Sequence, residues 1–124
     1  MQTGDALPFT TRHASFDGAR SKPTQSGYVL PFIDGPTRTL KRLESHLTRL
    51  HARSASHPPH RHEDEEIVIL RSGRIEVEVE GQVHSLLSGD MLVIASNDLH
   101  GIRNASNEVA EYYVVRFEVG QDSA

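Results

Sequence analysis

The chain has 124 residues, of which 36% are hydrophobic and 24% charged, and its formal net charge is −4 with histidine neutral. This length fits one domain with its own core, and the small acidic excess, without a run of like charges, argues against nucleic acid or a membrane as partner. Cysteine is absent, which excludes disulfides, thiolate chemistry and zinc-finger sites. No apolar run approaches the roughly 18 residues of a membrane span and no secretion signal is visible, so we expect a cytoplasmic protein.

The first and last segments differ from the body in composition. Residues 1–27 are rich in threonine, serine, glycine and proline, with Phe9 and Phe16 isolated among them. We interpret them as an irregular N-terminal arm that packs on the body or on a second subunit. Residues 28–120 are expected to form the single domain, and residues 121–124 a short tail.

The segment before the histidine-rich region permits two interpretations. Residues 28–33 favour a short strand that ends at the turn sequence Asp-Gly-Pro. In residues 37–52 the leucines recur at three and four positions, which is the period of an α-helix. The same residues also allow two short strands with a break near Glu44–Ser45. Local propensity favours the helix.

Residues 57–73, HPPHRHEDEEIVILRSG, carry the strongest chemical signal. His60 and His62 are one residue apart, so on an extended strand their side chains leave the same face, and Glu66 shares their parity. Two imidazoles and a carboxylate on one face suit a divalent transition metal. His100 is the obvious candidate for a fourth ligand. The plainer alternative is a solvated histidine-rich loop, because the prolines and the arginine in this stretch look exposed.

The chain after residue 73 has the alternation of β-strands. Residues 75–80 place apolar and acidic side chains on opposite faces, and we expect the three glutamates to form a solvated face. Turns of glycine, asparagine and aspartate separate further apolar stretches. We predict strands at 83–87, 91–95, 100–103 and 109–119. Many short strands without a convincing helix after residue 52 indicate an all-β antiparallel sandwich or barrel.

Two stretches at compatible separation resemble the two conserved motifs of the cupin superfamily, and the likeness covers roughly residues 40–118. The first motif matches in residues 60–73 and the second in residues 89–104. The matching positions are His60, His62, Glu66 and Gly73 in the first motif, and Gly89, His100 and Asn104 in the second. The sequence departs from the motifs at Ser54, Ala95 and Asn97, which stand where glycine, proline and glycine are usual, so we expect altered loop geometry there.

The resemblance implies a small, single-domain, RmlC-like jelly-roll barrel of six to eight strands with the metal inside one mouth. It also implies a strand rather than a helix in residues 37–52, because a strand precedes the first motif in cupins. The implied ligands are His60, His62, Glu66 and His100, around one divalent ion of iron, manganese, zinc or nickel. Four protein donors leave an octahedral ion two adjacent open positions. Single-barrel cupins are dimers, so we expect a homodimer.

The fold analogy supplies a site but no reaction. We expect a metal-dependent enzyme acting on a small organic ligand, either dioxygenase-like or a Lewis-acid isomerase or decarboxylase. The alternative is a cupin that binds or senses a small molecule without catalysis. Proton transfer would need a positioned carrier, and the sequence does not fix the catalytic residues. His46, Glu111 and Tyr113 are the candidates for that carrier.

Other polar residues have simpler interpretations. His57 precedes two prolines and is expected to be a loop residue rather than a ligand. His46 and Arg49 could line the pocket, although exposed sheet positions are favoured for both. Asn104 is expected to fasten the loop that carries His100 through backbone hydrogen bonds.

Overall fold

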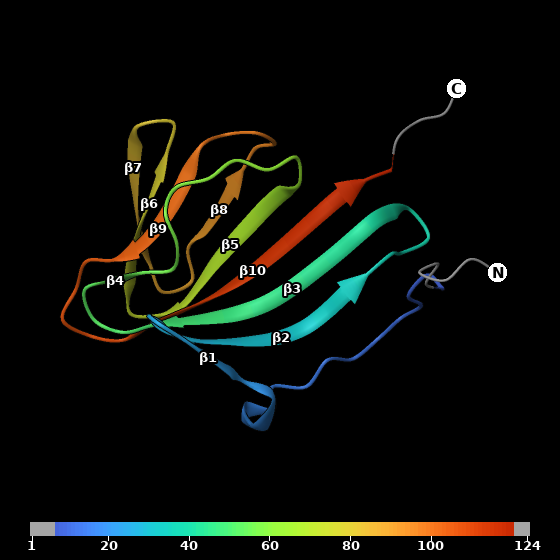
Figure 1. The fold of residues 1–124 in the computed structure, drawn as a ribbon, viewed down its shortest axis with the longest axis horizontal. Coiled ribbons are helices and arrows are strands. Elements are labelled where there is room, and N and C mark those ends of the chain that lie inside the picture. The colour runs from blue at the N-terminus through green and yellow to red at the C-terminus, as the bar shows by residue number, and fades with distance from the viewer. Residues whose placement is uncertain (1–6, 121–124) are drawn as a thin grey trace.

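The computed structural model describes residues 7–120, so the start of the arm and the predicted tail at 121–124 lie outside the described residues. A short 3-10 helix, η1, covers Gly18–Arg20. The strands, shown in Figure 1, are β1 (Lys22–Thr24), β2 (Gly27–Gly35), β3 (Leu40–Leu50), β4 (Ser54–Ala55), β5 (Glu65–Ser72), β6 (Arg74–Val79), β7 (Gln82–Leu87), β8 (Met91–Ile94), β9 (His100–Asn104) and β10 (Ala110–Val119).

The strands form two antiparallel sheets. The larger sheet has the order β1-β2-β3-β10-β5-β8, and the smaller has the order β4-β9-β6-β7. The predicted all-β antiparallel jelly roll is therefore confirmed. The described residues form ten strands rather than six to eight, because two short edge strands, β1 and β4, add to the eight longer ones. β1 lies within the segment that we interpreted as an irregular arm, and it pairs with β2.

β3 is one continuous strand, so the strand prediction for residues 37–52 is confirmed, but a break near Glu44–Ser45 is wrong. The leucines of β3 have helical spacing because both faces of the strand are covered. Leu50 belongs to the core between the sheets. Leu47 is also fully buried, but it lies on the outer face beside its strand partners Leu30 and Tyr113.

The N-terminal segment covers part of that outer face. The ring of Phe16 lies 6.4 Å from that of Phe32, which lies 6.1 Å from that of Tyr113. Phe9 joins residue 37 in a short parallel bridge. The arm therefore packs on the body of its own chain, as the isolated aromatic residues suggested. No helix within residues 7–120 is long and apolar enough to cross a bilayer.

The hydrophobic core lies between the inner faces of the two sheets. It contains Leu50, Val68, Leu70, Ile75, Val77, Leu86, Ile94, Ile102, Ala110, Tyr112 and Val114. Burial of each of the larger apolar side chains contributes about 1.5–3 kcal/mol relative to leaving it exposed. The barrel therefore has an apolar source of stability that is separate from the polar groups at its mouth.

Gly73 connects the larger sheet to the smaller one, between β5 and β6. Its φ of +80° is in the left-handed region, which residues other than glycine rarely adopt. A Cβ atom at this position would lie 2.6 Å from the carbonyl oxygen of Val109. The turn that ends the first motif therefore requires glycine both for its backbone conformation and for its close contact.

Candidate metal centre

His60 and His100 are joined through their backbones. The His60 N–H donates to the His100 carbonyl over 2.9 Å, and the His100 N–H donates to the His60 carbonyl over 3.0 Å. Residues that exchange both hydrogen bonds in an antiparallel pair project their side chains to the same face. This isolated bridge therefore places the second-motif histidine, on β9, beside the first-motif histidine, in the segment before β5.

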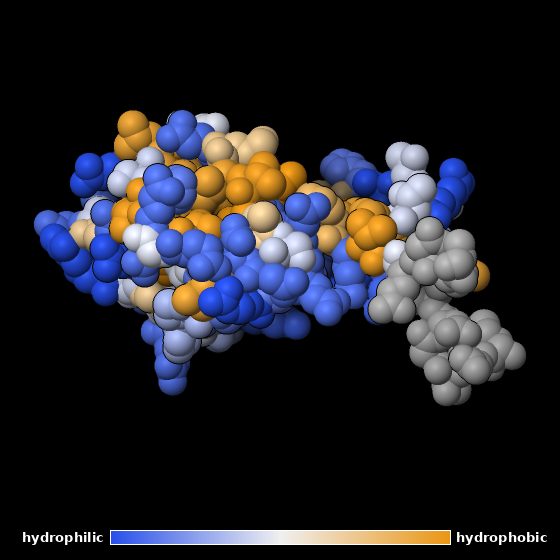
Figure 2. All heavy atoms as spheres, turned by 90° about the horizontal axis from the view of Figure 1, so that it is seen from above, coloured by the Kyte–Doolittle hydropathy of each residue, from blue (hydrophilic) through white to orange (hydrophobic). Residues whose placement is uncertain are grey.

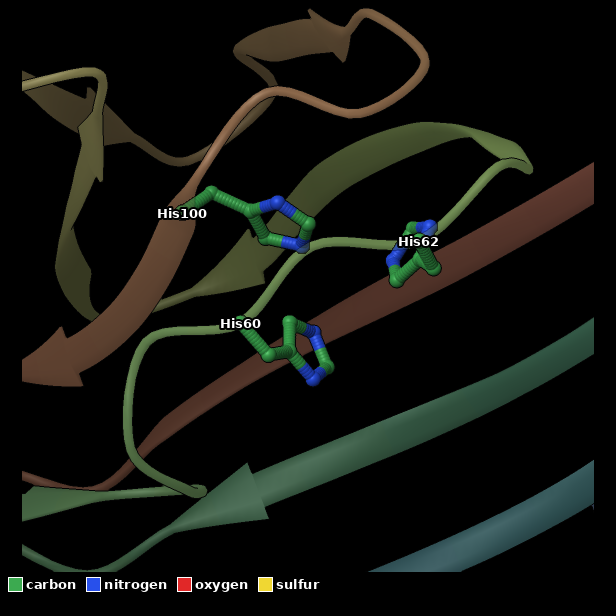
Figure 3. Close-up of side chains that lie close together, drawn as sticks. All are labelled: His60, His62 and His100. Carbon is green, nitrogen blue, oxygen red and sulfur yellow. The ribbon is translucent and has the colours of Figure 1, made fainter.

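His62 completes a cluster with these two residues. The three histidines, called the histidine cluster below, have candidate ligand atoms within 4.8 Å of one another. Figure 3 shows the three imidazoles converging, His100 from β9 and the other two from the loop before β5. Their spacing suggested a regular strand, but His60 and His62 lie in the loop before β5. The loop nevertheless turns both rings toward the same point.

Glu66 adds a carboxylate to the histidine cluster. It is the second residue of β5, only 5% exposed, and it faces the space between the sheets. Its Oε1 atom lies 3.3 Å from Nε2 of His62, and its Oε2 atom lies 3.8 Å from Nε2 of His100. The structure thus brings together all four residues that the sequence suggested as ligands.

The hydrogen bonds of two histidines fix which nitrogen faces the cluster. Nδ1 of His62 donates to the Asp64 carbonyl over 3.0 Å, and Nδ1 of His100 donates to the Asp98 carbonyl over 2.9 Å. In each neutral ring the proton is then on Nδ1, and Nε2 carries a lone pair. Both Nε2 atoms are buried without a hydrogen-bond partner among the described residues. Together with the Glu66 oxygens they form a set of acceptors without a donor.

The surroundings of His60 favour its neutral form. Burial, followed by the nearby rings of His57 and His100, lowers the pKa of His60 to about 4. The ring of His57 lies 4.0 Å from that of His60, while its own Nδ1 lies 2.8 Å from the Pro58 carbonyl. His57 is exposed and lies outside the group of converging ligand atoms. The structure therefore places His57 in the loop, as predicted.

A set of surface contacts fastens the two histidine-bearing loops to each other. Asn97, with a φ of +65°, donates its backbone N–H to the His62 carbonyl over 2.8 Å. Arg61 donates to the Asn97 carbonyl over 3.0 Å and to Oε1 of Glu80 over 2.9 Å. The same Glu80 oxygen accepts the Leu99 N–H over 2.7 Å. Glu80, predicted to be part of a solvated acidic face, therefore also orients the residue before His100.

Asn104 fastens a different part of the barrel from the one expected. Its buried amide donates to the carbonyls of Leu50, His51 and Glu108, over 3.3, 3.2 and 2.6 Å. Its oxygen accepts from both the N–H and the hydroxyl of Ser106. The structural role is as predicted, but it ties the end of β3 to the β9–β10 turn, at the opposite end of β9 from His100.

A cavity of about 200 Å³ lies beside the histidine cluster, between the two sheets. Apolar side chains from β2, β9 and β10 line it. Polar side chains come from β1, the β1–β2 turn, β3, β5, β10 and the segment between β4 and β5. These residues are Thr24, Ser26, Val29, His46, Thr48, Ser56, His57, His60, Glu66, Ile102, Tyr112, Val114 and Arg116. The volume is below the roughly 300–1,000 Å³ of sites for drug-sized ligands. The cavity therefore suits a small molecule.

The structure separates the three candidates for a proton carrier. Glu111 and Tyr113 are on the outer face of β10, where Glu111 accepts from the hydroxyl of Tyr28 over 3.1 Å. His46 lines the cavity instead, and the preference for an exposed position was wrong for this residue. Its Nδ1 atom lies 2.6 Å from Oε2 of Glu44, the neighbouring residue on the same face of β3.

Several residues in the cavity or on the inner face beside it escaped the sequence analysis. Glu44, Tyr112 and Arg116 could have been placed only by knowing which face of β3 and β10 is inside. Burial raises the pKa of the Tyr112 hydroxyl to about 12, so this group stays protonated. The hydroxyl of Ser56 is buried without a hydrogen-bond partner among residues 7–120. Arg49, by contrast, is outside the cavity, with its guanidinium 3.7 Å from Glu111.

Another hollow, of about 210 Å³, lies against the outer side of the smaller sheet. Its charged side chains include Glu76 and Arg103, which already pair with each other over 2.8 Å. It lacks the converging, unpaired acceptors of the histidine cluster. The chemistry of the side chains therefore favours the cavity between the sheets as the functional site.

A family model described as a cupin domain matches residues 46–116, more than half of the chain. No curated protein matches the sequence. Among solved structures, a Cupin 2 conserved barrel domain protein from Salinispora arenicola is similar, with a TM-score of 0.69 and 20% identity over 89% of this chain and 91% of that one.

Two further similar structures are named as enzymes. A sugar phosphate isomerase of the cupin superfamily from Silicibacter pomeroyi has a TM-score of 0.58 and 20% identity, over 68% of this chain and 54% of that one. A mutant of Bacillus subtilis oxalate decarboxylase has a TM-score of 0.71 and 21% identity, over 94% of this chain and 32% of that one. At these identities the likeness concerns the fold.

Proposed function

This chain belongs to the cupin domain family, and we propose that it binds one divalent transition-metal ion and acts as an enzyme on a small organic ligand in the adjacent cavity. The proposed ligands are His60, His62, His100 and Glu66. The observation that carries the proposal is that the buried, unpartnered Nε2 atoms of His62 and His100 face the Glu66 carboxylate. With the histidines neutral all of these atoms are acceptors, and they repel one another unless a cation lies between them.

The separations of these acceptors support the assignment. Two nitrogen or oxygen atoms that both bind an ion at about 2.1 Å lie about 3–4 Å apart. The 3.3 and 3.8 Å distances from Glu66 to His62 and His100 are in this range. The histidine nitrogens, within 4.8 Å of one another, need only a small rotation of their rings. The backbone carbonyls that accept from Nδ1 would hold the rings in the orientation for binding.

His46 favours a reaction with proton transfer over simple binding. When bound, the ion would act as a Lewis acid on a ligand oxygen. The Glu44 carboxylate holds Nδ1 of His46 and stabilises the charge that the ring acquires when Nε2 takes up a proton. Isomerisation and decarboxylation both require such a carrier. Proteins named for each of these activities share the fold.

Hydrogen exchange into candidate ligands tests this proposal. We expect metal-loaded protein in deuterated water to exchange carbon-bound protons of a small oxo or hydroxy acid, detected by proton NMR. His46→Gln should slow this exchange by about 100-fold or more and leave the metal content unchanged. Equal rates in the variant and the wild type would exclude His46 as the carrier. Ligand binding without exchange or conversion would support a binding module, and oxygen uptake by the iron form would indicate an oxygenase.

A further inference from the structure

Arg116 lies at the junction of the cavity and the proposed metal site. On β10 it pairs in register with Glu44 of β3 on one side and with Glu66 of β5 on the other. Its side chain is 24% exposed and lines the cavity that also contains His60. A guanidinium group thus lies in a row between a proposed metal ligand and the carboxylate that holds His46.

The guanidinium of Arg116 has charged neighbours but incomplete hydrogen bonding. Its Nε atom lies 3.4 Å from Oδ2 of Asp64 and 3.9 Å from Oε1 of Glu66. Nε is nevertheless buried without a hydrogen-bond partner among the described residues, and so is Oδ2 of Asp64. A buried N–H group that lacks a partner has a free-energy cost, so the carboxylates of the described residues do not satisfy the guanidinium of Arg116 fully.

Arg42 provides a comparison on the same side of the barrel. It donates from Nε and Nη2 to the two carboxylate oxygens of Asp34, over 2.9 and 3.1 Å. This is the bidentate pairing that the planar guanidinium group prefers. Its contact with Asp64 is longer, with 4.0 Å between Nη1 and Oδ2. Residues 7–120 therefore supply a bidentate carboxylate for Arg42 but none for Arg116, the arginine that lines the cavity.

We propose that the ligand of this site is a small carboxylic acid, whose carboxylate pairs with Arg116 while another of its oxygens faces the histidine cluster. This inference rests on the proposed function. Val29, Ile102 and Val114 would pack against its carbon atoms. The cavity volume of about 200 Å³ limits the acid to a few carbon atoms.

The local charges make the binding of such an acid dependent on the metal. Asp64 and Glu66 lie near the guanidinium of Arg116, and Glu44 is its partner in the strand register. The charge of Arg42, which lies 4.0 Å from Asp64, is balanced by Asp34. These three carboxylates and the one guanidinium of Arg116 therefore leave an excess of two negative charges with the histidines neutral. A divalent ion cancels this excess. An acid should therefore bind weakly to the metal-free protein and more tightly to the loaded one, whereas a neutral analogue should lack this dependence.

Lactate and 1,2-propanediol, which differ only in a carboxylate in place of a hydroxymethyl group, test the inference. Protein loaded with Mn²⁺ enhances the proton relaxation of a molecule bound beside the ion, so NMR titration gives the affinity of each probe. We expect lactate to bind wild-type protein more tightly than propanediol. Arg116→Gln should weaken lactate binding at least tenfold. Arg116→Lys, which keeps the charge but loses the planar fork, should weaken it less.

Arg42→Gln is the matched control, because it removes the same charge nearby from an arginine that already has its bidentate partner. This variant should bind lactate like the wild type. The inference is overturned if Arg116→Gln and Arg116→Lys both retain lactate affinity, or if propanediol binds as tightly as lactate. Metal content is measured on every sample. Wild-type protein that takes up no ion would instead overturn the proposed function.

Discussion

Glu44 and His46 lie two residues apart on β3, and a contact of 2.6 Å joins the carboxylate of one to the imidazole of the other. Both side chains leave the inner face of β3, where Glu44 is buried and His46 lines the cavity, because alternate residues of a strand share a face. On the next two strands the same face carries Arg116 and Glu66. The proposed proton carrier, the arginine and a proposed metal ligand therefore all lie on the inward face of three neighbouring strands.

Removal of a proposed ligand should release the metal without unfolding the barrel. His100→Ala and His60→Ala each delete a nitrogen donor, whereas the apolar core between the sheets stays intact. We expect the metal affinity to fall by more than the roughly 10- to 100-fold that follows loss of an outer-shell partner. Metal analysis and circular dichroism measure the two effects. His57→Ala, outside the cluster, is the control and should retain the metal.

Glu80→Gln should weaken the proposed metal site indirectly. Glu80 accepts the Leu99 N–H and pairs with Arg61, so it holds the loop before His100. Since Glu80 does not contact the cluster, we expect a loss of metal affinity below about tenfold. A metal-competition titration would measure it. An affinity equal to that of the wild type would show that these contacts do not orient His100.

The contribution of Glu80 to stability should depend on pH. The Leu99 N–H, with Arg61, holds the pKa of Glu80 below its ordinary value of 4.5. A carboxyl group with a lowered pKa in the folded state stabilises that state above its unfolded pKa, and the effect fades as the pH falls. We expect Glu80→Gln to lower the melting temperature at pH 7, with a difference that disappears as the pH falls below 4.5. A difference that stays constant with pH would contradict this.

The four ligands proposed from the sequence lie together because two short motifs fix both the loop before β5 and the start of β9. The all-β fold was predictable from the alternation in residues 75–80 and from the turns after it. The cupin resemblance is confirmed by the domain match. The assignment of the metal ligands stays a prediction, as does the division of the chain at residues 27 and 120.

The cavity was harder to predict than the ligands. A one-residue change in register moves every side chain to the opposite face. The pairing of β10 contains irregularities at Glu111/Tyr112 and Glu118/Val119, which sequence alternation does not reveal. The facing of Tyr112 and Arg116 therefore had to come from the structure. His46 was misplaced for a similar reason, because both faces of β3 are covered and its leucines do not mark one side as inner.

Asn104→Ala should destabilise the barrel. The change removes an amide that donates to three carbonyls and accepts from Ser106, at a position that is 1% exposed. Buried polar groups left without partners cost about 1–3 kcal/mol, so we expect unfolding in urea to show a loss of about 2–3 kcal/mol. Asn107→Ala is an exposed control and should change the free energy of unfolding by less than about 0.5 kcal/mol.

We propose that the chain forms a homodimer through the outer face of β5 and β8. Met91 and Val93 on β8 are 60% and 59% exposed, beside the half-buried Ile67 and Ile69 of β5. Figure 2 shows hydrophobic residues gathered over the barrel body with hydrophilic residues around them. Apolar rows of this kind suit a subunit interface.

Light scattering tests the dimer. We expect wild-type protein at micromolar concentration to have twice the chain mass of 13.8 kDa. The double variant with Met91→Glu and Val93→Lys should have the mass of one chain. Lys41→Glu, an exposed change on β3 away from this face, is the control. A wild-type mass of one chain would contradict the proposal.

The metal content of protein purified without added metal or chelator tests the central claim most directly. Mass spectrometry should find about one divalent transition-metal ion per chain in the wild type. The content should fall sharply in His60→Ala, His100→Ala and Glu66→Gln, all of which should keep the circular dichroism spectrum of the barrel. Folded wild-type protein without bound metal, even after incubation with iron, manganese, nickel or zinc, would contradict the claim.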